Sequence, residues 1–115
     1  MKLIVNADDL GLSKSVSDGI AFAYENKFIT STSLFANLEF TPYGIEIAKK
    51  FNFKDVGLHV NLTVGKSLSK NPKLCTFKCD SLVLPQKKVE YLASISYAEI
   101  KEEILAQLEF LNERE

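Results

Sequence analysis

Two acidic residues and one histidine are the side chains of this 115-residue chain that could act together in chemistry. Asp8 and Asp9 follow a short apolar run, and His59 is the only histidine. Adjacent carboxylates repel each other, so a nearby cation favours the state in which both are ionised. Carboxylate oxygen with imidazole nitrogen suits Zn²⁺, Mn²⁺ or a similar divalent ion. The residue types therefore favour a metal site. The alternatives are turn or capping chemistry for the acidic pair and a structural, hydrogen-bonded role for the histidine.

Three strand patterns would position these residues. The apolar run at residues 2–6 predicts a buried strand, and residues 30–37 predict a second one. Residues 55–64 alternate between an aliphatic face and a small, polar face that carries His59. Active sites of α/β folds lie at the carboxyl ends of parallel strands, where the acidic pair would stand. The polar face of the third strand predicts a surface that looks into a water-filled or ligand-filled space, such as the mouth of a barrel.

Helical patterns alternate with these strands. A first helix is predicted to begin near residues 13–17, where three serines could act as its cap, and to extend toward Phe28. Thr41 and Pro42 predict the start of a second helix, with the threonine hydroxyl at the cap. A capping-box pattern at Ser96 predicts a third helix that runs to the end of the sequence. Its expected buried stripe consists of Tyr97, Ile100, Ile104, Leu108 and Leu111.

The region between the third strand and the last helix is predicted to be mostly loop. Residues 66–95 contain two prolines and many lysines, and a short hairpin is expected at residues 76–84. Cys75 and Cys79 are the only cysteines, and without a second pair they do not form a zinc knuckle. We expect both to be free thiols.

Composition narrows the class of protein. The chain is 46% hydrophobic and 25% charged, which is typical of one soluble globular domain. Fourteen basic and fifteen acidic residues leave no positive excess for nucleic acid or an anionic membrane. No apolar stretch approaches the roughly 18 residues needed to span a bilayer. We therefore expect a cytoplasmic protein that binds neither nucleic acid nor membrane.

Three motifs resemble those of a known family. The segments at residues 6–13 (NADDLGLS), 30–37 (TSTSLFAN) and 57–66 (GLHVNLTVGK) resemble the YdjC-like carbohydrate deacetylases, which include chitooligosaccharide deacetylases. The resemblance covers nearly the whole chain but only the N-terminal half of the family's domain. It implies a distorted (β/α) barrel of the polysaccharide-deacetylase type, incomplete in this chain, so that residues 1–115 would form a single, apparently truncated domain.

The resemblance also implies an activity and roles for site residues. The activity would be metal-dependent removal of acetyl groups from N-acetylated oligosaccharides, with one divalent ion, Mg²⁺ or Zn²⁺, as cofactor. Asp9 and His59 would bind the metal, and Asp8 would be the general base; the two aspartates could exchange these roles. The family's second histidine ligand has no counterpart here, because His59 is the only histidine.

Other functions fit the same sequence. The chain would act with a separate C-terminal half, as one part of a split enzyme, or as a homo-oligomer. It could instead be a non-catalytic carbohydrate-binding or interaction module. A receiver-like doubly wound domain, with the acidic pair binding Mg²⁺, is a further alternative that leaves the histidine strand unexplained.

Overall fold

The computed structural model describes residues 3–76, 89–90 and 93–114, and within these it has an alternating α/β architecture. Its elements in chain order are β1 (Asn6–Leu10), α1 (Lys14–Glu25), β2 (Ser31–Leu34), α2 (Thr41–Lys50), β3 (Val56–Leu58) and α4 (Tyr97–Asn112). The strands form one parallel sheet in the order β1-β2-β3, which is also their order in the chain. The α/β class predicted from the sequence is confirmed at this level.

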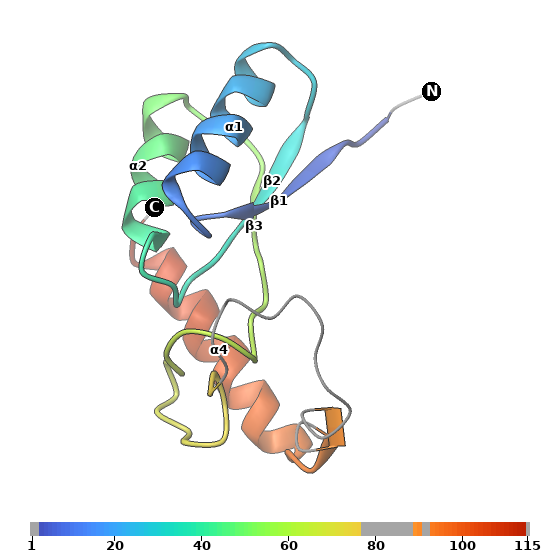
Figure 1. Cartoon of the computed structure of the whole chain (residues 1–115), viewed down its shortest axis with the longest axis vertical. Helices are drawn as coiled ribbons and strands as arrows, with labels where there is room; N and C mark the ends of the chain where they lie inside the picture. Colours follow the sequence, from blue (N-terminus) through green and yellow to red (C-terminus); the bar gives the residue numbers. More distant parts are fainter. Residues whose placement is uncertain (1–2, 77–88, 91–92, 115) are drawn as a thin grey trace.

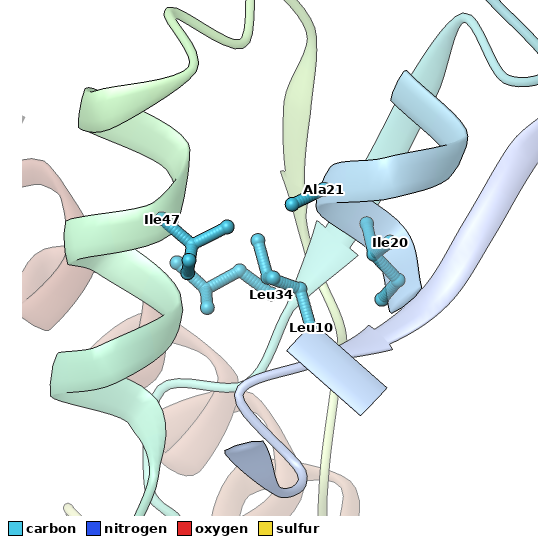
Figure 2. Close-up of a cluster of buried hydrophobic side chains, with 5 residues drawn as sticks. All are labelled: Leu10, Ile20, Ala21, Leu34 and Ile47. Carbon is cyan, nitrogen blue, oxygen red and sulfur yellow. The ribbon is translucent and has the colours of Figure 1, made fainter. Parts of the chain in front are cut away.

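The helices α1 and α2 lie side by side and pack on the sheet (Figure 1). The apolar core between these layers, drawn in Figure 2, consists of Leu10, Ile20, Ala21, Leu34 and Ile47. Alternation along a strand sends every second side chain to this core, so Leu34 and Thr32 of β2 are buried while Ser31 and Ser33 are only partly covered. The sheet therefore has one apolar face, covered by helices, and one polar face.

Two glycines allow α2 to approach the start of α1 closely. A Cβ atom added at Gly44 of α2 would lie 2.7 Å from Cδ1 of Leu34 and 3.0 Å from Cα of Gly11. These distances are shorter than ordinary van der Waals contact. The turn that follows β1 is thus seated directly against α2.

The first strand lies further along the chain than predicted. Strand pairing begins at Asn6, which is in register with Ser31, so the acidic pair lies within β1 and not after it. Leu3 and Ile4, predicted to be buried, are 71% and 78% exposed. The backbone of Val5 is still bonded to Thr30, but no described segment covers the side chains that precede it. Apolar content alone does not determine which residues find a partner strand.

The second and third strands are shorter than predicted. β2 spans four residues, and β3 spans three of the ten predicted. The backbone N–H of His59 still donates to the carbonyl of Leu34, at 2.9 Å, but the chain then leaves the sheet. Val56 and Val60, on the aliphatic face of the predicted strand, are 38% and 45% exposed.

The helix starts are partly as predicted. Ser13 caps α1, accepting a hydrogen bond from the N–H of Val16, and Ser96 forms the predicted capping box with Glu99. Thr41 was predicted to be a cap but is the first residue of α2. Its hydroxyl oxygen accepts a hydrogen bond from the N–H of Leu38 and so holds the preceding turn.

The buried face of α4 is not the predicted one. Tyr97 is 80% exposed and Leu108 is 40% exposed, whereas Glu103 and Gln107 are completely buried. The physical reason is that α4 packs against residues 61–75, a segment without regular structure whose backbone polar groups need partners. Polar side chains supply these partners.

The remaining predictions concern the loop. Residues 66–76 contain no helix or strand, as expected. The expected hairpin extends beyond Thr76 into residues that, like Cys79, lie outside those described. Cys75 is a buried free thiol.

Within the described ranges, the helices are too short or too polar to cross a bilayer.

Candidate functional site

A group of polar side chains lies on the face of the sheet opposite α1 and α2. Oδ1 of Asp8 accepts two hydrogen bonds, one from Nδ2 of Asn6 and one from the Ser33 hydroxyl, both at 2.8 Å. Oδ2 of Asp8 has no hydrogen-bond donor among the described residues. The Asp8 carboxylate is therefore oriented through one oxygen and leaves the other free to take a proton.

The backbone of Asp9 brings a second carboxylate to the same site. In a regular strand, Asp8 and Asp9 would point to opposite faces. Here the register between β1 and β2 shifts between Ala7 and Leu10, and Asp9 has a φ of 74°. Such irregularities re-aim side chains. Asp9 thereby places Oδ1 3.4 Å from Nδ1 of His59, and its N–H donates to the same nitrogen at 3.3 Å.

His59 is held from three sides. Its N–H donates to Leu34, and its imidazole stacks on the buried ring of Phe35, with centroids 4.2 Å apart and 22° between the planes. The Ser33 hydroxyl lies 3.3 Å from Nδ1. The backbone N–H of Asp9 also donates to Nδ1, so three groups fix the position of this nitrogen.

The structure brings together all three residues that the sequence singled out. The hydroxyl of Ser33 contacts both Asp8 and His59, and Asp9 joins the group through its contacts with His59. Sequence reasoning missed the role of Ser33. Its signal was the alternation in residues 31–34, which places two serines on the face away from the core.

Cys75 belongs to a separate buried cluster. Its thiol accepts a hydrogen bond from Nδ2 of Asn37 at 3.2 Å. Burial, together with the nearby Glu103 carboxylate, raises the pKa of the thiol to about 11 despite the Asn37 hydrogen bond. A thiol that stays protonated at neutral pH is a poor metal ligand.

The donor atoms at the site fit a divalent ion in part. Asp9 and His59 offer an oxygen and a nitrogen, and their side chains are 43% and 28% exposed, so both can be reached. Asp8 offers a second carboxylate to the site, and the Ser33 hydroxyl links it to His59. Within the described part of the chain, however, no three His, Cys, Asp or Glu side chains converge closely enough to hold an ion. The residues present amount to two ligands of a larger set.

The chain is similar to proteins of known name. The family model of YdjC-like proteins matches residues 2–113. A carbohydrate deacetylase of Halalkalibacterium halodurans is 36% identical over 109 residues, which are 95% of this chain and 42% of the relative. A carbohydrate deacetylase of Clostridium beijerinckii is 45% identical over 73 residues, 64% of this chain and 30% of the relative. A chitooligosaccharide deacetylase of Salmonella paratyphi B is 43% identical over 72 residues, 63% and 29% respectively. The chain thus spans less than half the length of these relatives.

Proposed function

The chain belongs to the YdjC-like family, and from this we propose that it supplies the first part of a metal-dependent hydrolase that removes acetyl groups from N-acetylated carbohydrates such as chitooligosaccharides. The names of the relatives, carbohydrate deacetylase and chitooligosaccharide deacetylase, support the activity and the substrate class. The single observation that carries the proposal is the contact chain Asp8–Ser33–His59–Asp9, in which the Ser33 hydroxyl contacts Asp8 and His59 and the Asp9 carboxylate lies 3.4 Å from His59.

The proposal gives each site residue a role that its contacts support, with the two aspartates interchangeable. Asp9 and His59 would hold one divalent ion, Mg²⁺ or Zn²⁺, because they present close oxygen and nitrogen donors. Such an ion, when bound, polarises an acetamide carbonyl and lowers the pKa of water. Asp8 would act as general base through Oδ2, while Asn6 and Ser33 keep Oδ1 occupied and the carboxylate oriented.

The architecture in this proposal is an incomplete barrel. The β/α units at β1, β2 and β3 would be the first units of a distorted (β/α) barrel, with residues 1–115 as one truncated domain. The further metal ligands would then come from a separate C-terminal half or from a second copy of the chain. β1 is an edge strand of the described sheet, and the residues Leu3 and Ile4 just before it are exposed, which supports pairing with such a partner.

A calorimetric titration of the 115-residue chain with Zn²⁺ tests the metal site. With water molecules completing the coordination that the two side chains begin, we expect one ion to bind with micromolar affinity, about −8 kcal/mol, and Asp9→Asn and His59→Ala each to abolish binding. Asparagine is the preferred replacement because it tolerates the positive φ of Asp9. Asp18→Asn is the matched control, because Asp18 accepts its hydrogen bond from Tyr43, on α2, away from the site. Binding that survives in the two site variants would refute the ligand assignment.

Acetate release from a chitooligosaccharide then tests the reaction. If the titration gives micromolar binding, the zinc-loaded chain is expected to release acetate, and Asp8→Asn to lower the rate by about 10²–10⁴ while leaving zinc affinity intact. Sugar binding without acetate release would contradict the hydrolase and favour a non-catalytic carbohydrate-binding module.

A further inference from the structure

The segment that carries His59 is held by a side chain of α4. After Leu58 the chain leaves β2, and Asn61 has no strand beside it to receive its backbone groups. The carboxamide of Gln107 takes this place. Its Oε1 accepts from the N–H of Asn61 at 3.1 Å, and its Nε2 donates to the Asn61 carbonyl at 2.6 Å. Gln107 thus pairs with Asn61 as a neighbouring strand would.

The orientation of the Gln107 carboxamide is fixed by a second contact. Its Nε2 also donates to Oε1 of Glu103, one helical turn away, at 2.8 Å. Glu103 in turn accepts hydrogen bonds from Ser67, Leu68 and Ser69. Gln107 and Glu103 are completely buried, and every polar atom of the Gln107 side chain has a partner. Helix α4 lies beside the loop beyond His59 (Figure 1), and its Gln107 and Glu103 side chains bond this loop at two successive points.

We propose that Gln107 is a positioning residue for His59: by fixing the backbone of Asn61 it holds the imidazole on Phe35 and in front of Asp9. The backbone around His59 is bonded to Leu34 on one side and to Gln107 on the other. The side chain of Asn61 is also bonded to Asn37 and Val64. Removing the Gln107 pairing therefore frees the Asn61 backbone, which is joined to His59 through the exposed Val60, while the Asn61 side chain stays held. This inference rests on the proposed function, in which His59 binds the metal, and it assigns a function to a helix that contributes no ligand.

The test uses His59 as its own reporter, because the chain has a single histidine. Protons of the imidazole that stacks on Phe35 lie in the shielding region of that ring and are displaced upfield in a ¹H NMR spectrum. The variant Gln107→Met keeps the length of the side chain but cannot pair with Asn61. We expect it to lose the upfield displacement, approaching the spectrum of Phe35→Leu, and to bind Zn²⁺ about 10-fold to 100-fold more weakly.

Two further variants make the outcome specific. Ile47→Val removes a methylene from the core on α2, far from Asn61, and is expected to keep the displacement and the zinc affinity. If Gln107→Met fails to give a folded far-UV circular dichroism spectrum, Gln107→Asn replaces it, because its shorter carboxamide cannot reach both backbone groups.

The results separate this inference from the proposed function. Unchanged histidine signals in the folded Gln107 variant would overturn the positioning role, whatever the zinc affinity of the parent chain. Loss of the displacement in Ile47→Val as well would also overturn it, since the ring would then respond to any loosening. A parent chain that binds no Zn²⁺ but loses the displacement on Gln107→Met would support the positioning of the ring and refute the metal site.

Discussion

The hydroxyl of Ser33 donates a 2.8 Å hydrogen bond to Oδ1 of Asp8. The same oxygen lies 3.3 Å from Nδ1 of His59. Ser33 therefore stands between the proposed base, on β1, and a proposed metal ligand, just after β3, which lie about fifty residues apart in the sequence. A change at this one position should act on both groups at once.

A third carboxylate at position 33 tests this arrangement. We expect Ser33→Asp to lower the free energy of unfolding by about 1 kcal/mol without metal, because the new charge lies beside Asp8 in a solvent-exposed place. With Zn²⁺ the variant should gain more in Tm than the parent chain, since a carboxylate joins Asp9 and His59. Ser31→Asp is the control, because Ser31 contacts Asn6 and not the acidic pair. Equal zinc-induced shifts in the two variants would contradict the convergence.

The close approach of α2 to the start of α1 predicts opposite effects for two glycine substitutions. Gly44→Ala should destabilise the chain by about 1–3 kcal/mol, because its Cβ would meet Leu34 and the backbone of Gly11. Gly19→Ala on α1 meets no atom within 4 Å and should stabilise by about 0.5–1 kcal/mol, as alanine does in a helix. Urea unfolding of both variants measures the difference, and a neutral Gly44→Ala would show that the two helices pack less tightly.

The buried carboxylate of Glu103 predicts a loss of stability in acid. Burial by itself raises its pKa, but hydrogen bonds from Gln107, Ser67 and Ser69 outweigh burial, and the pKa lies below the ordinary 4.5. A lowered pKa in the folded state stabilises the fold above the ordinary value, and this stability is lost as pH falls through the lowered one. The unfolding free energy should therefore decrease below about pH 4.5.

Substitution of Glu103 separates its share of that pH dependence. Glu103→Gln should lower the free energy of unfolding by about 1–3 kcal/mol at neutral pH, because a buried donor loses its acceptor. It should also weaken the fall of that free energy in acid, which we call the acid limb. Glu102→Gln, at the exposed neighbouring position, is expected to leave the limb unchanged. The pKa of Glu99 is lowered to about 2, chiefly by Lys73. Its own contribution to the loss of stability in acid should therefore persist in both variants. An identical acid limb in Glu103→Gln would contradict the assignment.

The raised pKa of Cys75 predicts slow alkylation. A thiol shifted from 9.0 to about 11 has about 100-fold less thiolate at pH 8 than an unperturbed one. In a Cys79→Ser background, iodoacetamide should therefore modify the folded chain at least about 100-fold more slowly than the chain in urea. Similar rates in both conditions would show that Cys75 is open to solvent.

Features set by neighbouring residues could be predicted from the sequence. The capping box at Ser96 and the cap at Ser13 depend on side chains within a few residues, and both form as predicted. The proposed site residues also came from local motifs, and the structure brings them close together. Their role as a site stays a prediction.

Features set by distant partners could not be predicted in this way. Helical spacing on α4 marks an apolar stripe, but the loop that the helix covers presents backbone N–H and carbonyl groups, which select Glu103 and Gln107 instead. The positive φ of Asp9 is likewise invisible in the sequence, because it follows from the shifted register with β2. Ser33 was overlooked because a serine on a strand has no signature of its own until its neighbours across the sheet are known.

The order of the strands bears on how the chain is assembled during synthesis. Each strand pairs with the one made just before it, as Ser31 does with Asn6, which lies 25 positions earlier. The sheet can therefore grow at the ribosome one unit at a time, with short loops to close. The contact of Asn61 with Gln107 spans 46 positions and waits for α4. The sheet can thus form first, and the pairing of Asn61 with Gln107 follows once α4 has emerged.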